Sequence, residues 1–322
     1  MTTKKLTITY QSLCVGPVLC QSTGGSVSNT QNSRAAQGTQ KYAKGAAESH
    51  KKAWVSGVAE ATIVKSMLNL AYNEAKTKTG FPPDIMVLGE CCHDYGPITI
   101  NAHDYYPSEW QCTGKEQHCF VMFAKGVWAT QKSAVIETRS VKPNLPGAFH
   151  VVLDEKVNVF FVHIPNNMCG GDPANKYYEA LFAAAKDAVK HKTPSSPHGT
   201  TNSPAWVIIG DTNEGKNGRW DSYQKVWEEN SIKSQGPLAR LVHGNIQTHT
   251  GGTDNAYHDT IITNQNLKDK RHHTPGQSSV KTSIGTDIVG RVTVEPYGYI
   301  PRGDHLKTYT DHLGLIMQLS YN

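Results

Sequence analysis

The sequence predicts an α/β protein built as a four-layer sandwich, in which two mostly antiparallel β-sheets pack face to face and helices cover the outer faces. Short apolar segments of strand length recur along the whole chain, and longer segments carry apolar residues at helical spacing. Strands alternate with helices at first and then follow one another directly, a pattern typical of such layered folds. No internal repeat and no linker is visible, and we therefore expect one domain over residues 1–322.

The expected strands are short segments that are either apolar throughout or alternate between apolar and polar residues. The first begins almost at the start of the chain, where Leu6, Ile8 and Tyr10 alternate with polar residues. Strands are predicted at residues 6–10, 84–88, 119–124, 127–129, 134–139, 157–164, 205–209, 257–262 and 313–319. Helices are predicted at residues 54–78, 173–190 and 221–229. Residues around 21–50 and 265–310 are rich in small and polar residues and are expected to form loop insertions.

The composition excludes several classes of protein. Hydrophobic residues make up 38% and charged residues 18%, which is not the composition of a disordered chain. No apolar run approaches the ~18 residues of a membrane-spanning helix. The N-terminal segment alternates like a strand and lacks the apolar centre of a cleavable signal peptide. This leaves three alternatives: a cytoplasmic protein, one exported by a route without such a signal, or one whose signal lies outside this sequence. The net charge of +5 permits a polyanionic partner without requiring one.

The cysteines leave the disulfide state open. There are seven, an odd number, so at least one is unpaired in the monomer that we expect. Their spacing does not match a structural zinc site. Cys112 with Cys119, or Cys14 with Cys20, could form disulfides, and free, buried cysteines are the alternative.

Acidic residues and histidines gather at the ends of the predicted strands. Glu90 follows the strand at 84–88, and Asp211 follows the strand at 205–209. His163 lies at the end of another apolar strand, and two Asp-containing pairs, His258-Asp259 and Asp311-His312, lie at the last two predicted strands. Strand ends present side chains to a cleft, and carboxylates gathered there repel one another unless a cation neutralises them. Hydrolysis of a phosphate ester needs the same kind of positive charge.

In their order along the chain, these motifs resemble those of the endonuclease/exonuclease/phosphatase superfamily, and most closely those of deoxyribonuclease I and the cytolethal distending toxin catalytic subunit. The resemblance extends over residues 6 to 319 and implies a deoxyribonuclease I-like sandwich. It implies that Glu90, Asp311 and Gln11 hold Mg²⁺, with Mn²⁺ or Ca²⁺ as alternatives. It also implies a catalytic set, which consists of His163, Asp211, Asn213, Asp259, His312 and Glu116.

Each catalytic residue has an implied role in the attack of water on a phosphodiester. Asp211 would align and deprotonate the water, and Asn213 would hold the water or the phosphate. His312, held by Asp259, would donate an N–H to a phosphate oxygen. His163, held by Glu116, would form a second histidine–carboxylate pair near the phosphate. A core histidine at 163 and a solvated charge at 116 are the alternatives.

One loop before the strand at 257–262 looks like the segment with which deoxyribonuclease I contacts DNA phosphates. The candidates there are Thr248, Thr250, Thr253 and Asn255. An ordinary hairpin loop is the alternative interpretation.

Three positions depart from the superfamily pattern. Gln11 stands where the superfamily has Asn, Thr212 stands where it has an apolar residue, and His258 adds a residue before Asp259, which leaves the register of that strand open by one.

The function predicted on these grounds is that of a metal-dependent phosphodiesterase, an endonuclease that hydrolyses DNA. The alternative is a phosphoesterase that acts on a phospholipid or a phosphoinositide, as a sphingomyelinase or an inositol phosphatase does. A non-catalytic binding protein on the same scaffold is a third class, against which the retained Asp211, Asn213, Asp311 and His312 argue.

Overall fold

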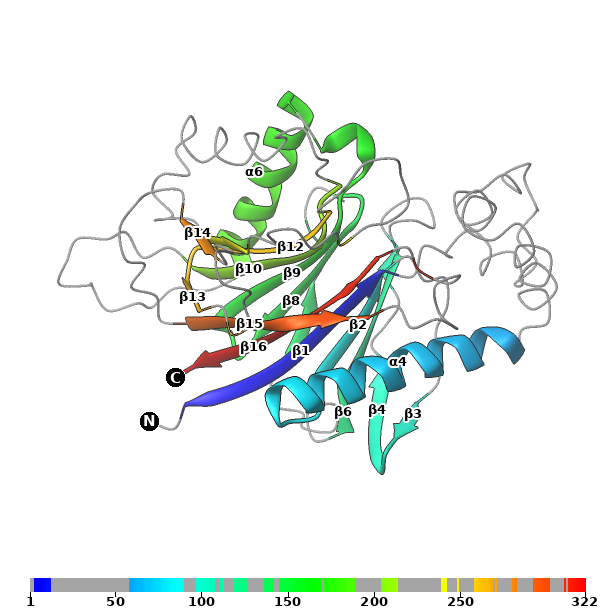
Figure 1. The fold of residues 1–322 in the computed structure, drawn as a ribbon. Coiled ribbons are helices and arrows are strands. Elements are labelled where there is room, and N and C mark those ends of the chain that lie inside the picture. Colours follow the sequence, from blue (N-terminus) through cyan, green and yellow to red (C-terminus); the bar gives the residue numbers. More distant parts are fainter. Residues whose placement is uncertain are drawn as a thin grey trace, which may run out of the picture.

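The computed structural model places two β-sheets face to face between two long helices (Figure 1). It describes the following residues: 3–12, 58–89, 97–107, 111–112, 119–126, 136–139, 141, 145–169, 171–188, 204–213, 239–241, 248, 258–268, 270, 280–282, 292–301, 310 and 312–322. The predicted four-layer α/β sandwich is confirmed.

The first sheet has nine strands within these ranges, and β5 pairs with β6 beside the main path. In spatial order the strands are β13 (Asn266–Leu267), β15 (Val292–Ile300), β16 (Gly314–Tyr321), β1 (Lys4–Ser12), β2 (Ile85–Gly89), β6 (Cys119–Lys125), β4 (His103–Pro107) and β3 (Ile98–Ile100), with β5 at Gln111–Cys112. β1 lies at the centre, antiparallel to β16 and parallel to β2.

The second sheet has seven strands in the described part of the chain. Their order is β14 (Val280–Thr282), β11 (Ala239–Leu241), β12 (Asp259–Thr263), β10 (Ala205–Asp211), β9 (Val157–His163), β8 (Ala148–Leu153) and β7 (Ile136–Arg139). The central strands β9 and β10 run parallel and are buried on both faces, which explains their nearly continuous apolar sequences.

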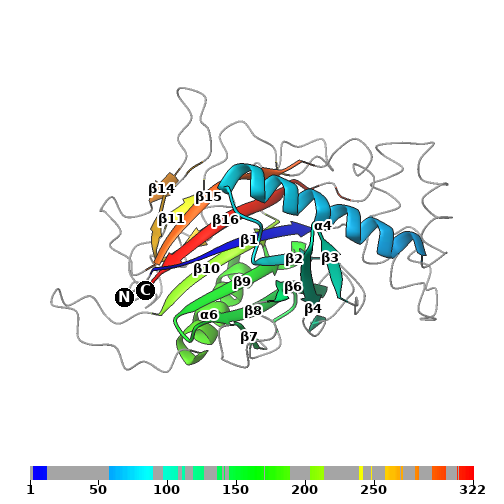
Figure 2. The same ribbon diagram turned by 90° about the horizontal axis from the view of Figure 1, so that it is seen from below.

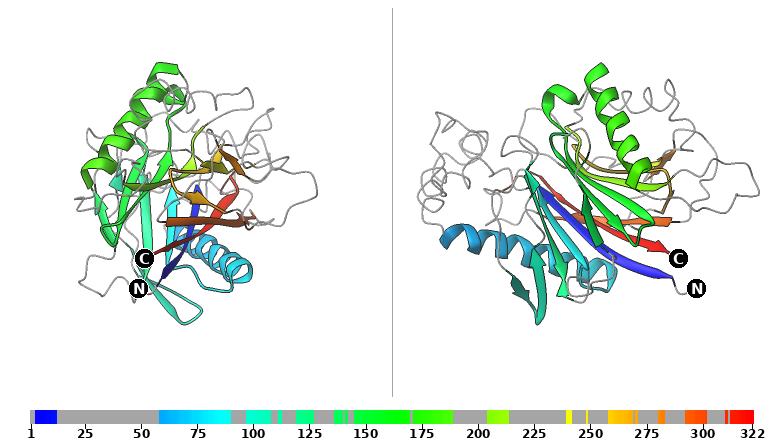
Figure 3. Two further views of the ribbon diagram at one scale, coloured as in Figure 1. Left: turned by 90° about the vertical axis from the view of Figure 1, so that its left-hand side faces the viewer. Right: turned by 180° about the vertical axis from the view of Figure 1, so that it is seen from behind.

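A helix covers the outer face of each sheet, as the two views of Figure 3 show. α4 (Val58–Thr79) packs on the first sheet, where Figure 2 shows it crossing the strands. α6 (Gly171–Ala188) packs on the second sheet, and the short 3₁₀-helix η4 (Asn166–Met168) precedes it. α4 ends where Gly80 adopts a left-handed conformation (φ 81°) and its N–H bonds the carbonyl of Lys76. No helix among the described elements is long and apolar enough to cross a membrane.

The apolar side chains form three layers, one between the sheets and one beneath each helix. In β1 the alternation seen in the sequence sends Leu6, Ile8 and Tyr10 into the layer between the sheets. The intervening residues face the α4 side, and this places Gln11 on the opposite face from Tyr10.

The sequence predicted most of the long strands and both described helices, but it missed several strands. Eight were not expected: β3, β4, β5, β8, β11, β13, β14 and β15. Three of these, β13, β14 and β15, lie within residues 265–310, so the interpretation of that stretch as one continuous loop was wrong. The segments 21–50, 127–129 and 221–229 lie outside the described residues. The single domain remains a prediction.

Several strands end or begin at one edge of the sandwich. β1, β2, β9 and β10 end there, and the antiparallel β12 and β16 begin there. The hydroxyl of Tyr10 on β1 donates to the carbonyl of Val162 on β9, which joins the two sheets at this edge. The two chain termini lie together at the opposite edge, where Lys4 pairs with Tyr321 (Figure 1).

Candidate active site

The registers of three neighbouring strands place three predicted site residues in one row. Asp211 on β10 pairs with His163 on β9 and with Asp259 on β12. Residues paired directly across a sheet point to the same face, so all three side chains meet at the strand ends. This register also answers the question left open by the extra His258, because Asp259 is the residue that faces Asp211.

Gly210 lets β10 run close to β9 just before the site. Its φ is 138°, and a Cβ atom at this position would overlap the carbonyl oxygen of Val162. Only glycine avoids both the strain and the overlap. The Gly-Asp motif therefore has a physical reason, since the glycine permits the backbone geometry that presents Asp211.

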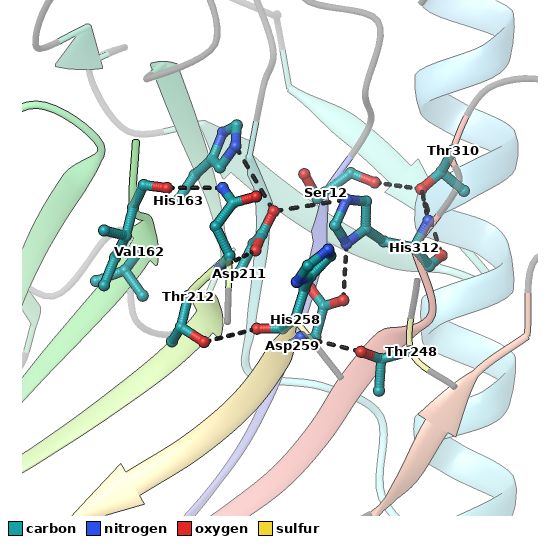
Figure 4. Close-up of polar contacts among 12 residues, drawn as sticks. Ser12, Val162, His163, Asp211, Thr212, Thr248, His258, Asp259, Thr310 and His312 are labelled. Atoms are coloured by element: carbon teal, nitrogen blue, oxygen red, sulfur yellow. Dashed lines mark hydrogen bonds and ion pairs between the residues drawn. The ribbon is translucent and has the colours of Figure 1, made fainter. Parts of the chain in front are cut away.

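Asp211 lies between two histidine rings (Figure 4). Its Oδ2 atom is 3.6 Å from Nε2 of His163 and 3.5 Å from Nε2 of His312. Nδ1 of His312 donates to Oδ2 of Asp259 over 2.7 Å. All four side chains are at least nine-tenths buried. The 2.7 Å contact is a hydrogen bond, whereas the two longer contacts are beyond good hydrogen-bond length and act chiefly through charge.

The pKa of Asp211 reflects opposing effects. Burial raises it, but the charges of His312, His163 and His258 and a hydrogen bond from the backbone N–H of Asn213 outweigh burial. The net effect lowers the pKa of Asp211 below the ordinary value for aspartate. The carboxylate is therefore ionised at neutral pH although water does not reach it.

Asn213 shapes the turn that follows β10. It adopts a left-handed conformation (φ 52°), which Asn tolerates better than most residues. Its backbone N–H donates to Oδ1 of Asp211 over 2.6 Å, and its side-chain Nδ2 donates to the carbonyl of Ile164 over 2.6 Å. Asn213 thus orients Asp211 and ties the turn to the end of β9.

His258 is a site residue that the sequence analysis did not assign. Its ring centre is 6.3 Å from that of His312, and its charge contributes to the lowered pKa of Asp211. Its carbonyl accepts hydrogen bonds from both the N–H and the hydroxyl of Thr212, which holds it beside the site. The signal in the sequence was its position directly before Asp259, because a residue there lies at the start of β12, beside the end of β10.

Thr248 occupies a different position from the one expected of a DNA contact. Its side chain is completely buried. Its hydroxyl oxygen accepts the N–H of Asp259, and its carbonyl accepts the N–H of Leu313. These bonds connect the starts of β12 and β16, which gives Thr248 a structural role, and its contact with DNA stays a prediction. The other three expected contacts, Thr250, Thr253 and Asn255, lie outside the described residues.

The predicted metal ligands are described only in part. Glu90 and Asp311, and also the predicted His163 partner Glu116, lie outside the described residues. Within the described ranges no three His, Cys, Asp or Glu side chains form a group that could hold a metal ion.

Gln11 is the one predicted ligand that the structure describes, and it lies at the end of β1. The chain reaches Glu90 one residue after Gly89, which pairs with Ser12. Within the described part of the chain, the buried Oε1 of Gln11 has no hydrogen-bond partner, and neither does Oγ of Ser12. A buried oxygen without a partner is costly unless something binds it, and oxygen is the ligand that Mg²⁺ prefers. The described residues at this edge therefore fit a hard cation.

Comparisons with known proteins identify the fold. No family model matches the sequence, and no curated protein matches it. Similarity is found among solved structures. ANGEL2, a 2′,3′-cyclic phosphatase, is 11% identical with a TM-score of 0.50, and the match covers 99% of this chain and 95% of that chain. The AP endonuclease LMAP from Leishmania major is 10% identical with a TM-score of 0.45, covering 99% and 89%.

The cytolethal distending toxin from Actinobacillus actinomycetemcomitans is 14% identical with a TM-score of 0.41, and that match covers 77% of this chain and 90% of the toxin chain. Identities this low establish the fold alone. The protein has the deoxyribonuclease I-like fold, as its motifs predicted.

Proposed function

We propose that the protein is a divalent-metal-dependent phosphodiester hydrolase and that it cleaves DNA as an endonuclease. The observation that supports this most directly is the buried Asp211 carboxylate between His163 and His312, with Asp259 behind His312. A charged carboxylate and histidine N–H groups at one strand edge are the groups that can align water and stabilise a reacting phosphate.

Asp211 acts mainly by orientation. A carboxylate with a lowered pKa accepts a proton only weakly, because catalytic bases work best with a pKa near the working pH. Its charge and its bond from Asn213 instead fix the direction from which water approaches the phosphorus atom. Its charge also favours the protonated forms of the neighbouring histidines.

His312 is the group that meets the negative charge that develops on the phosphate. Nδ1 is bound to Asp259, which fixes the tautomer and leaves Nε2 as the atom that donates to a phosphate oxygen. His163 presents a second Nε2 atom from the other side of Asp211. One donor placed in advance for a transition-state oxyanion is worth about 10²–10³-fold in rate.

The proposed metal is Mg²⁺, with Mn²⁺ or Ca²⁺ as alternatives, held by Glu90, Asp311 and the Oε1 atom of Gln11. When bound, such an ion neutralises charge on the phosphate and lowers the pKa of a bound water.

DNA is proposed as the substrate because the chain has a net charge of +5 and histidines at the site that favour an anionic backbone. Phosphate contacts carry no sequence information, so cleavage should show little base preference. We propose further that the protein acts as a monomer.

A substrate panel tests the proposal. Purified protein is incubated with supercoiled plasmid, sphingomyelin vesicles, phosphoinositides and a 2′,3′-cyclic nucleotide, each with Mg²⁺ and with excess chelator. We expect the plasmid to be nicked only with the metal, and more slowly as salt rises. The His312→Ala variant is the control against a contaminating nuclease. If a lipid or the cyclic nucleotide is hydrolysed and the plasmid is not nicked, that compound class replaces DNA as the proposed substrate. If no substrate of the panel is hydrolysed, the proposal that the protein is a phosphodiesterase is refuted.

A further inference from the structure

The side chain of Gln11 binds the segment that carries His312. Its Nε2 atom lies 3.1 Å from each of three acceptors, which are the carbonyl of Ser12, the hydroxyl of Thr310 and the carbonyl of His312. All these residues are buried. The two N–H groups of one amide therefore join the end of β1 to a segment some 300 positions away in the sequence.

The hydroxyl of Thr310 completes this network. It donates to the carbonyl of Ser12 over 2.5 Å and accepts N–H groups from Gln11 and from the backbone of His312 (Figure 4 shows the contacts with Ser12 and His312). A hydroxyl has one donor and two acceptor sites, and here all three are used. Gln11, Ser12, Thr310 and the backbone of His312 are called the strand-end clamp below.

The clamp holds His312 by its backbone, while Asp259 holds its ring. The backbone N–H of His312 is bound by Thr310 and its carbonyl by Gln11. The ring is bound by Asp259. With its backbone and its ring both held, His312 has its Nε2 atom 3.5 Å from Oδ2 of Asp211.

We propose that Gln11 is a positioning residue for catalysis, which acts by holding the backbone of His312 through its amide N–H groups. This is distinct from the ligand role of its oxygen, and it rests on the proposed function. The positioning role also explains why the residue is Gln and not the shorter Asn, because the amide group must reach acceptors on two segments. The space for it comes from Gly314, where a Cβ atom would overlap Oε1 of Gln11.

Substitutions at Gln11 separate the two roles. Gln11→Glu keeps an oxygen for a metal but replaces the donating nitrogen with an acceptor that faces three acceptors. Gln11→Met keeps the length and removes both functions. The matched control is Gln318→Met, because Gln318 is a buried glutamine in the same sheet that donates to the hydroxyl of Thr7, away from the site.

The expected result is a fall in kcat at both Gln11 variants. Misplacing a catalytic group by about 1 Å can cost ~10²-fold, so we expect kcat to drop about 10- to 100-fold while KM changes less than about threefold. Gln318→Met should keep the wild-type kcat even though it loses a buried hydrogen bond. If Gln11→Glu retains the wild-type kcat, or changes only the Mg²⁺ concentration at half-maximal rate, the clamp is overturned.

Thr310 supplies an independent test of the same network. Thr310→Val removes the hydroxyl at nearly constant volume and should lower kcat as Gln11→Met does, whereas Thr310→Ser keeps the hydroxyl and should restore most of it. The double variant Gln11→Met/Thr310→Val should be no slower than the worse single variant, since both act through His312. Effects that multiply would overturn the proposal.

A spectroscopic readout keeps this inference separate from the proposed function. The ring nitrogen resonances of ¹⁵N-labelled His312 should shift in Gln11→Met and remain in place in Gln318→Met, with or without activity. If the wild-type protein hydrolyses none of the panel substrates but the shift appears, the proposed function fails and the clamp stands as a positioning contact. An unchanged His312 spectrum in Gln11→Met overturns the clamp itself.

Discussion

Replacing Asp259 with asparagine tests how the carboxylate supports His312. The change is nearly isosteric, and the side chain is completely buried with Oδ2 2.7 Å from Nδ1 of His312. It therefore removes a charge without opening a cavity.

The size of the effect follows from this one contact. A hydrogen bond to a charged group contributes about 1.5–3 kcal/mol, and each 1.36 kcal/mol is tenfold in rate, so kcat should fall about 10- to 150-fold. The upper end is expected where the amide turns its NH₂ group toward Nδ1, because His312 then holds its proton on the wrong nitrogen.

The assay is plasmid nicking under saturating Mg²⁺, with melting temperatures measured alongside. The double variant Asp259→Asn/His312→Ala should be no slower than His312→Ala alone, because Asp259 acts only through His312. A wild-type kcat in Asp259→Asn would refute this reasoning. A large drop in melting temperature would instead mean that the pair is chiefly structural.

Four further predictions follow from the site. Asp211→Asn should lower kcat by ~10²-fold at an unchanged fold, because the water is then no longer oriented; nicking and circular dichroism measure this, and a wild-type rate would remove Asp211 from the mechanism. Because folding lowers the pKa of Asp211, its charge stabilises the protein above the unfolded pKa of about 4, and this contribution is lost as pH falls through the folded pKa. Denaturant titrations should therefore show that the difference in stability between wild type and Asp211→Asn shrinks below about pH 4. A difference that stays constant with pH would contradict the lowered pKa. Excess chelator should abolish nicking and added Mg²⁺ should restore it, whereas undiminished activity would exclude a metal requirement. Gly210→Ala should destabilise the fold by about 2–6 kcal/mol, because backbone strain and overpacking cost ~1–3 kcal/mol each, and an unchanged denaturation midpoint would argue against the close approach to Val162.

The strands that sequence predicted best are those with continuous apolar runs. β9 and β10 are buried on both faces, so their sequences show no interruption. β8 was missed although it is equally buried, because His150 lies in its middle. The structure accommodates that histidine by stacking it on Phe160 and bonding it to Asn158 over 2.9 Å, a cross-strand pairing that a local pattern does not contain.

β15 was missed for a different reason. Its burial alternates from Val292 to Ile300, as expected of a strand, but Pro296 and Gly298, two residues that are rare inside strands, interrupt its sequence. The register shifts between these two residues, and Gly298 adopts a φ of 139°. The proline and the glycine thus lie at an irregularity of the strand. Only the pairing of β15 with β16 reveals that the strand continues through it.

For the site, the sequence was informative about which residues gather and uninformative about how they bind. Strand ends predicted that His163, Asp211 and Asp259 meet, because β9 and β10 end, and the antiparallel β12 begins, at the same edge of the sheet. The bonds from Gln11 to Thr310 and His312 join distant segments, and no spacing in the sequence signals them. The part played by His258 was missed because an added residue before a motif was interpreted only as a shift of register.

The pairing of β1 with β16 bears on when the protein can act. Its candidate catalytic groups come from both ends of the described chain, and Gln11 is separated from His312 by 301 positions. During synthesis, β1 leaves the ribosome first and stays without its central neighbour until the last strand follows. Until then the position of His312 is unformed and one edge of β1 is unpaired. The candidate site is therefore completed only when β16 pairs with β1, so its assembly depends on closure of the first sheet.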